Sequence, residues 1–431
     1  MKLDGTFARA GFVDPFWVTV GVWSFVLLGA AAADLNPLSV EFVAFVFVGV
    51  GAHLAGMGLC LRQARRRNPT ISAKPPLPSE ESRRQGQRSL RKATRTTYVL
   101  LAILLAALIF FIRAYMEVVP SLDAIGFIAA RNAYLEEARG LRDKFFLYTT
   151  HATLLGLAAM FFAAKAYRQA GSLGICASRV PATVLAITVF SLALLTTGRT
   201  APLLVIISYS FYSLRFGLFK PQTVVVAFGC LSLTMFVVVA FAFGKEGLGT
   251  SDQISIGESL ANLGRIYFFS APLAMQEVVL RNEVVSNVCS NIFSYPLDLL
   301  KKVGFFQQCE ARELDFVFVP VATNVFTFLR AYWEDFSWGY PIALFLSGYL
   351  IEYIYLRAIR RIGFSTFLFP FILNGVLLQI FEEQIFANGS VFAYLLVSFL
   401  ICDWLYRIPR PRKRQTSSYI PLTGSESPTL G

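Results

Sequence analysis

Long apolar segments alternate with short polar ones along almost the whole chain. Crossing a bilayer takes about 17–25 residues of apolar helix. Ten segments reach or approach that length: 16–33, 40–61, 98–119, 145–164, 180–197, 201–219, 223–243, 340–356, 364–381 and 391–406. The pattern predicts an all-α polytopic integral membrane protein, a single membrane domain over 1–431. The mixed stretch after the seventh segment has room for a further hairpin, so we expect about 10 (10–12) transmembrane helices.

The composition supports this class of protein. Hydrophobic residues make up 55% of the chain, charged residues only 15%, and the mean hydropathy is +0.57. A soluble globular chain carries about 25% charged residues, so a soluble enzyme with one anchor is excluded. The net charge of +12 does not indicate nucleic acid, because Lys and Arg are concentrated in short segments between the apolar runs. Their expected neighbour is the lipid bilayer with its anionic headgroups.

The basic residues also predict the sides of the membrane, because cytoplasmic loops carry an excess of Lys and Arg. If the basic linker 62–97 is cytoplasmic, strict alternation places four further segments with it: 165–179, 215–220, 357–361 and the basic, disordered tail 407–431. Together with Lys2 and Arg9, these segments hold 26 of the 39 basic residues. Both termini are then cytoplasmic. The 62–97 linker contains "KPPLPSEESRRQ", and we expect it to be flexible.

The opposite side, periplasmic in a bacterium, receives the loop 120–144, the bend at 198–200 and a large loop over 244–339. That large loop has seven basic and eleven acidic residues. The N-terminal stretch 1–33 allows one alternative, a cleaved signal peptide with "AAA" before Asp34. Its charged start is weak, because Asp4 and Asp14 offset the two basic residues, so an uncleaved first span is favoured.

Metal and cofactor sites are poorly supported. The chain has two histidines, His53 and His151, and six scattered cysteines without a CxxC pair. A packing role is expected for both histidines, and no cofactor is expected. Cys289 and Cys309 both fall in the large outer loop, where a disulfide is one alternative and free thiols are the favoured one.

The bend "TTGRTAP" places Arg199 between two apolar segments. A cation near membrane depth costs about 2.5–3.5 kcal/mol on insertion scales, so a compensating partner is expected. Thr200 precedes Ala201 and Pro202, a sequence typical of a helix start. A helix N-terminus attracts anions, and a guanidinium matches two phosphate oxygens. The bend therefore suits a diphosphate, although a snorkelling arginine that touches headgroups is an equal alternative.

A second candidate site lies in "VPVATNVFTFLRAYWEDFSWGYP", residues 319–341, where aromatic rings alternate with polar groups. Rings that stack on sugars and polar groups that bind hydroxyls are what a glycan cleft needs. The polar candidates are Asn324, Thr327, Arg330, Glu334 and Asp335. Asp335 or Glu334 is the candidate proton acceptor for an attacking hydroxyl. The alternative is an amphipathic loop on the bilayer surface.

Upstream, "NLGRIYFFSAPLAMQEVVLRN" (262–282) carries Arg265, Tyr267 and Glu277 in a half-apolar setting. Its apolar run is short and interrupted by Pro272, so we expect a re-entrant or interfacial helix. Arg131 in the outer loop is another phosphate candidate, although pairing within that charged loop is favoured. The sequence has no GxxxxGK[ST], GxGxxG or DxD motif, so the usual motifs that bind nucleotide phosphates and their metal ions are missing.

Three motifs in order carry a family resemblance: the "TGRT" bend, "YFFSAPLAMQEVV", and "ATNVFTFLRAYWEDFSWGYPIALFLSGYLIEYIY". Over about residues 190–360 the chain resembles the Wzy-type polymerases of bacterial O-antigen, capsule and exopolysaccharide assembly. It departs from their pattern where Ser337 and Trp338 replace a small Gly-containing turn.

The resemblance implies a glycosyltransferase of the bacterial inner membrane. It would transfer a glycan from undecaprenyl diphosphate onto the terminal sugar of another lipid-linked repeat unit. Arg199 would bind the diphosphate and stabilise its charge as it leaves, with Arg265 or Arg330 sharing that task. Asp335 or Glu334 would orient or deprotonate the acceptor. The remaining substrate-binding candidates are Thr200, Tyr267, Asn324 and Thr327. A chain-length regulator and a flippase are the implied partner proteins.

Two other functions stay open. A lipid-linked glycan ligase of the O-antigen ligase type would use the same donor and the same kind of arginine with a different acceptor. A flippase for the repeat unit would be expected to carry charges inside several spans. Here the unusual groups gather at one face, which favours chemistry at a surface over transport.

Overall fold

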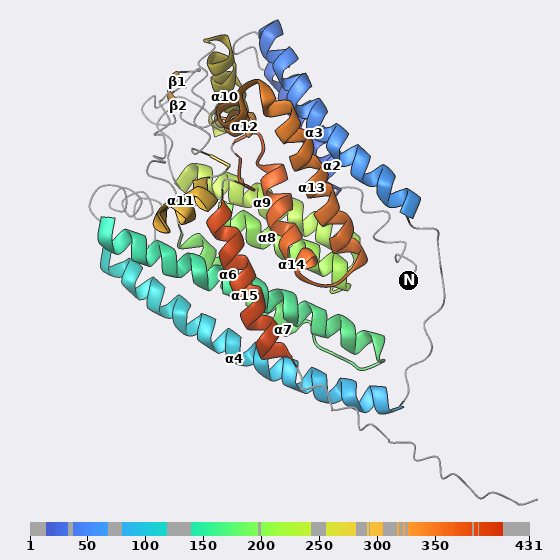
Figure 1. Cartoon of the computed structure of the whole chain (residues 1–431). Helices are drawn as coiled ribbons and strands as arrows, with labels where there is room; N and C mark the ends of the chain where they lie inside the picture. Colours follow the sequence, from blue (N-terminus) through green and yellow to red (C-terminus); the bar gives the residue numbers. More distant parts are fainter. Residues whose placement is uncertain are drawn as a thin grey trace, which may run out of the picture.

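A computed structural model shows the protein as a bundle of long helices (Figure 1). It describes residues 14–32, 38–67, 80–118, 139–196, 200–242, 256–281, 291–292, 294–304, 317–318, 322–323, 326–381, 383–386 and 388–407. The helices of the N-terminal half are α2 (Pro15–Ala32), α3 (Val40–Arg67), α4 (Glu80–Val118), α6 (Arg139–Ser172), α7 (Val180–Leu194), α8 (Thr200–Phe216) and α9 (Pro221–Ala242).

The second half contains α10 (Ile256–Leu280), α11 (Ser294–Lys302), α12 (Leu329–Phe336), the 3-10 turn η2 (Ser337–Gly339), α13 (Tyr340–Arg360), α14 (Phe364–Leu377) and α15 (Gly389–Tyr406). Two short strands, β1 (Val317–Phe318) and β2 (Ala322–Thr323), pair antiparallel, with Val317 opposite Thr323. Cys289, Cys309 and Arg131 lie outside the described residues.

The chain is a helical, multi-pass membrane protein, as the apolar pattern predicted. Each of the ten predicted segments coincides with one helix: α2, α3, α4, α6, α7, α8, α9, α13, α14 or α15. Four stretches in the described part are long and apolar enough to cross a membrane: Val40–Ala64, Gly86–Met116, Leu329–Arg360 and Gly389–Tyr406. Shorter apolar helices, such as Val180–Leu194 and Phe364–Leu377, pack among them.

The expectation of a flexible linker over 62–97 was wrong for most of that stretch. α3 continues to Arg67, and α4 already begins at Glu80. The physical reason is local: "EESRRQGQRSLRKA" is rich in Arg, Glu and Gln, which favour helix, and the prolines end before it. Because this basic stretch is helical, the charged residues and the apolar residues of α4 belong to one continuous helix.

α4 has two distinct faces. Ala93, Thr97 and Leu104 are buried on the side that packs against α6, α7 and α15. The Thr97 hydroxyl shares a hydrogen bond of 2.7 Å with the Tyr406 hydroxyl at the end of α15. On the outer face large apolar side chains are exposed, Ile109 among them at 68%. Buried residues at spacings of three and four, with an apolar outer face, fit a helix between protein and lipid.

α3 and α13 form the closest helix pair, and glycines make it possible. A Cβ atom at Gly56 would overlap the main-chain oxygen of Phe345, and one at Gly348 would overlap that of His53. Small residues at a contact let two helix backbones approach in this way inside membranes. The pair brings α12, which is joined to α13 through η2, against the N-terminal part of α3, where Phe45 meets Trp333.

A cluster of aromatic rings in the core joins α6, α8, α14 and α15. The Phe161 ring lies 5.4 Å from Tyr212, 5.6 Å from Phe216, 5.8 Å from Phe367 and 5.9 Å from Phe399, measured between ring centroids. Most of these rings meet edge to face, the favoured geometry for aromatic pairs.

The basic turns lie together at one end of the bundle. The Arg215 guanidinium donates to the main-chain oxygen of Ile359 at 2.9 Å, and Arg179 donates to that of Leu218 at 3.2 Å. These bonds join the turns that follow α6, α8 and α13. The charge count placed the same turns on one side of the membrane. We name this end of the molecule the basic end and the other the opposite end.

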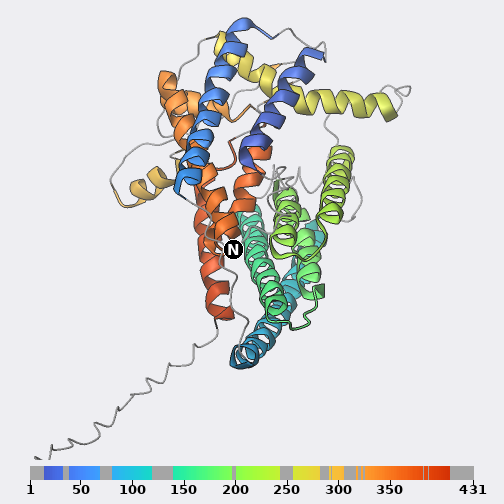
Figure 2. The ribbon, with the colours of Figure 1, turned by 90° about the vertical axis from the view of Figure 1, so that its right-hand side faces the viewer.

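At the opposite end α10 lies across α2 and α3 rather than along them (Figure 2). It contains Pro272 and is held by ring contacts between Phe25 and Phe268, 5.4 Å apart. The Gln276 side chain accepts a hydrogen bond from the Ser39 main chain at 2.9 Å. A helix was predicted here, and its crosswise direction suits the expected interfacial or re-entrant segment.

Candidate functional site

The candidate site is built on α12, at the opposite end of the bundle, where all residues from 326 to 335 are buried. The helix starts where the main-chain N–H of Phe328 donates to the main-chain oxygen of Gln379 at 2.8 Å. It ends at Ser337, which has a φ of 47°. This conformation turns the chain through η2 into α13. Both ends of α12 are therefore fixed, and its polar side chains are held in an apolar surrounding.

Arg330 is the central cation of the site and is only 7% exposed. Its Nε lies 2.6 Å from Oε1 of Glu334, one helical turn further on. The guanidinium carbon stacks over the Phe326 ring, 3.7 Å from its centroid. Within the described part of the chain, Nη1 of Arg330 has no hydrogen-bond partner. A buried guanidinium with an unmet donor is a favourable place for an anion.

The two adjacent carboxylates, Glu334 and Asp335, bind the segment before α11. Asn291 donates from its side-chain amide to Oε2 of Glu334 at 3.1 Å and to Oδ1 of Asp335 at 3.0 Å. The main-chain N–H of Ile292 donates to Oδ2 of Asp335 at 2.7 Å. Both carboxylates thus accept hydrogen bonds through both oxygens, and each is at most 4% exposed. In this arrangement the two carboxylates position the segment at Asn291 and Ile292.

Two further donors near Arg330 are buried without a partner among the described residues. They are the hydroxyl of Thr327 and the indole N–H of Trp333. Buried donors of this kind are normally bonded to protein or water. Three unmet donors in a stretch of seven residues therefore point to bound water or a ligand.

Aromatic rings surround these polar groups. Trp333 meets Phe45, Trp338 and Tyr340 edge to face, with ring centroids 5.3 to 5.4 Å apart. Trp338 is 78% exposed, so one ring of this cluster is available at the surface. The predicted combination of rings with polar groups is present, with most of the rings packed on one another.

A buried polar network next to α12, formed by Trp23, His53 and Gln379, was not predicted. Gln379 accepts from the Trp23 indole at 3.3 Å, and its amide nitrogen lies 3.3 Å from Nε2 of His53. Nδ1 of His53 lies 3.1 Å from the main-chain oxygen of Leu344. Since a carbonyl only accepts, Nδ1 carries the proton and Nε2 accepts from Gln379. The packing role predicted for His53 is confirmed. Its place in an otherwise apolar run was the one clue to this network.

The other histidine is also packed. The His151 ring meets Tyr394 edge to face at 4.2 Å between centroids. Within the described residues, no group of three His, Cys, Asp or Glu side chains is arranged to hold a metal ion.

A buried carboxylate that was not singled out lies in α13. Glu352 is fully buried, and neither of its carboxylate oxygens has a hydrogen-bond partner in the part of the chain that the structure describes. An ionisable residue inside a membrane span is costly and usually functional.

The structure brings together four of the predicted site residues: Thr327, Arg330, Glu334 and Asp335. Arg199 and Asn324 lie outside the described residues. Arg265 and Tyr267 are on α10, in its first half, and for these two residues only the main chain is described.

Thr200 is the first residue of α8 and is exposed, with Pro202 in the same turn. The helix start predicted there is confirmed. α8 packs on α6, α7, α9 and α14, and its first residue follows Arg199 in the sequence.

Comparison of the chain with family models, curated proteins and solved structures finds no match.

Proposed function

We propose that the protein is a polymerase that joins undecaprenyl-diphosphate-linked oligosaccharide repeat units at the periplasmic face of the bacterial inner membrane. In this proposal about ten helices span the membrane, with both termini in the cytoplasm. The basic end faces the cytoplasm and α12 faces the periplasm. The proposal rests on the resemblance of the sequence motifs and on the chemistry of the α12 site.

The observation that carries the proposal is Arg330. It is a buried cation at the opposite end from the basic turns, and its Nη1 has no partner among the described residues. A diphosphate leaving group needs charge stabilisation where its negative charge develops. Arg199 would bind the diphosphate. Arg330 on α12 would help to stabilise the negative charge that develops on the leaving group.

The hydrogen bonds of Glu334 and Asp335 suggest a division of labour between the carboxylates. Glu334 holds the Arg330 guanidinium in place through its 2.6 Å contact. Asp335 holds Asn291 and Ile292, so substrate entry that displaces that segment would release its carboxylate to orient the acceptor hydroxyl. Trp338 is exposed and is positioned as a ring on which a sugar can stack.

The proposal is tested by elongation in a defined membrane. The purified full-length protein is placed in liposomes that contain undecaprenyl-diphosphate-linked repeat units and no nucleotide sugar. We expect glycans of two and more repeat units, because the diphosphate linkage is already activated. Liposomes that hold the protein and yield only single units would contradict the proposal.

Glu352 favours transport of the lipid-linked unit as a second candidate function. A fully buried carboxylate without hydrogen-bond partners in the described part of the chain is the kind of group that transport pathways carry inside a span. The same liposomes separate the two functions. A transporter would move single repeat units to the opposite leaflet without elongating them, and Glu352→Gln would stop that movement.

A further inference from the structure

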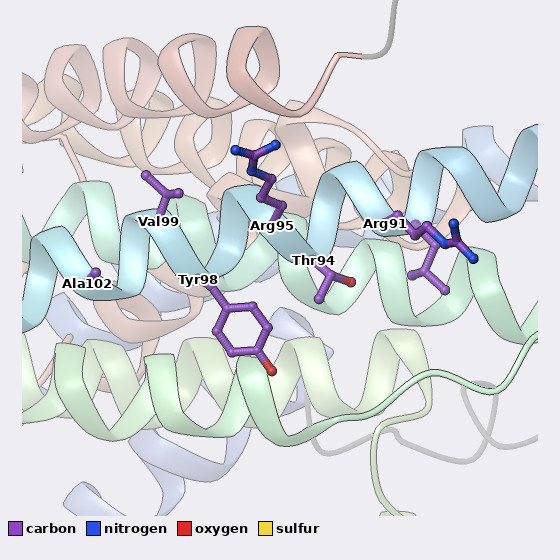
Figure 3. A pocket seen from close by; sticks show the side chains of 7 residues that line it. Arg91, Thr94, Arg95, Tyr98, Val99 and Ala102 are labelled. Atoms are coloured by element: carbon purple, nitrogen blue, oxygen red, sulfur yellow. The ribbon is translucent and has the colours of Figure 1, made fainter.

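A shallow cavity, widely open and lined by side chains of α4 alone, lies on the outer face of that helix. Figure 3 shows its lining: Arg91, Thr94, Arg95, Tyr98, Val99 and Ala102. These side chains belong to the face of α4 that does not pack on α6, α7 or α15.

The chemistry of this lining changes along the helix axis. Arg91 and Arg95 stand at one end, one helical turn apart, with Leu90 and Thr94 beside them, and Val99 and Ala102 stand at the other. Tyr98, 54% exposed, lies between them. Since an α-helix rises 1.5 Å per residue, about 10 Å separates Arg95 from Ala102 along the axis. The cavity therefore joins a doubly cationic end to an apolar one.

The two arginines have no anionic partner among the residues that the structure describes. Both are exposed, and neither forms an ion pair or a hydrogen bond with any residue that the structure describes. By contrast, their neighbour Lys92 on the packed side donates to the main-chain oxygen of Arg407. The two positive charges at this cavity are thus available to a ligand.

The cavity lies where α4 enters its apolar stretch. The membrane-compatible part of the helix runs from Gly86 to Met116, and the contact of Lys92 with Arg407 places this stretch at the basic end. Tyr at such a boundary sits at headgroup level, and Arg side chains reach outward from it. A ligand that touches the guanidinium groups and the apolar wall together must span headgroup and acyl region.

We propose that this cavity is a binding site for an anionic phospholipid. The phosphodiester lies between Arg91 and Arg95, which offer planar donors matched to phosphate oxygens, and an acyl chain lies along Val99 and Ala102. Basic pockets on the cytoplasmic side of membrane helices bind anionic headgroups in this way. The site is remote from α12 and is independent of the proposed function.

The test is binding of short-chain phosphatidylglycerol to the full-length protein in neutral detergent. The double substitution Arg91→Gln/Arg95→Gln is expected to weaken binding by roughly tenfold to thirtyfold. Arg84→Gln/Arg88→Gln removes the same charge from the same helix outside the cavity, and should change affinity less than about twofold. Phosphatidylcholine with the same acyl chains, and glycerol phosphate without them, should bind at least tenfold more weakly than phosphatidylglycerol.

A second variant separates the cavity from the charge. Ala102→Trp fills the apolar end while it leaves both arginines in place, and Ala102 is exposed, so folding is not at risk. Binding of phosphatidylglycerol should fall with this variant too. Equal losses for the two arginine pairs, an unchanged affinity in Ala102→Trp, or equally tight binding of phosphatidylcholine or glycerol phosphate would overturn the proposal.

Discussion

Arg330 and Glu334 form a buried ion pair on α12, with Nε of Arg330 2.6 Å from Oε1 of Glu334 and side-chain exposures of 9% and 4%. The same i,i+4 spacing occurs in an exposed pair, Asp403 and Arg407 at the end of α15. There the contact is also 2.6 Å, and the arginine side chain is 71% exposed. The two pairs differ in burial, which decides what a broken pair costs.

The buried pair predicts a large loss of stability when one partner is removed. Glu334→Gln should destabilise the protein by about 3–5 kcal/mol, because it leaves a buried guanidinium without its counter-charge. Asp403→Asn should cost about 0.3–0.5 kcal/mol. Thermal unfolding in detergent compares the two variants. Similar shifts in the midpoint for both would show that the α12 pair is solvated.

Asp335 is predicted to order the chain before α11. It accepts from the Ile292 main chain and from Asn291, so Asp335→Ala should release residues 291–304. We expect faster hydrogen exchange at Ile292 and in α11, with exchange in α15 unchanged. Exchange followed by peptide mass spectrometry measures this. Unchanged protection of Ile292 would mean that other contacts hold the segment.

Ser337 is predicted to be a strained position. Its φ of 47° with a ψ of −129° lies in a region that glycine adopts readily and other residues avoid. Ser337→Gly should therefore raise stability by about 1 kcal/mol, whereas Ser337→Ala should give no such gain. The unfolding midpoints of the two variants decide the matter, and a loss with glycine would refute the strain.

The proposed sidedness predicts where thiol reagents reach the protein. Cys176 is exposed in the turn after α6, at the basic end, so a membrane-impermeant maleimide should label it only after permeabilisation. Thr200→Cys, at the start of α8, should be labelled in intact cells. Peptide mapping distinguishes these sites from the other cysteines. The reverse order of labelling would invert the topology.

Ten of the helices were predictable because each coincides with a continuous apolar run, a property of local sequence. The i,i+4 spacing of Arg330 and Glu334 was also visible, since residues four apart are neighbours on a helix. The sequence suggested separate roles for them, as phosphate ligand and proton acceptor, and the structure shows that the two side chains are paired.

The partners of these residues were not predictable. Asn291 is 43 residues from Glu334, and Gln379 is 326 residues from His53. Hydrophobic periodicity reports which face of a helix is buried, and it carries no information on which distant polar groups meet there. The same limit applies to the unmet donors of Thr327 and Trp333. Whether a buried donor finds a hydrogen-bond acceptor depends on every segment that packs around it.

Production of polymer by variants of Arg199 tests the central claim most directly, namely that the guanidinium of this residue binds the diphosphate of the lipid-linked donor. In cells that depend on this protein for their surface glycan, Arg199→Ala should abolish the ladder of long chains and leave single repeat units, with the protein still inserted. Arg199→Lys should also be impaired, because an ammonium lacks the two-pronged contact. Arg281→Ala, which removes an exposed arginine paired with Glu277 on α10, should keep the full ladder. Long chains at normal abundance in Arg199→Ala would contradict the account.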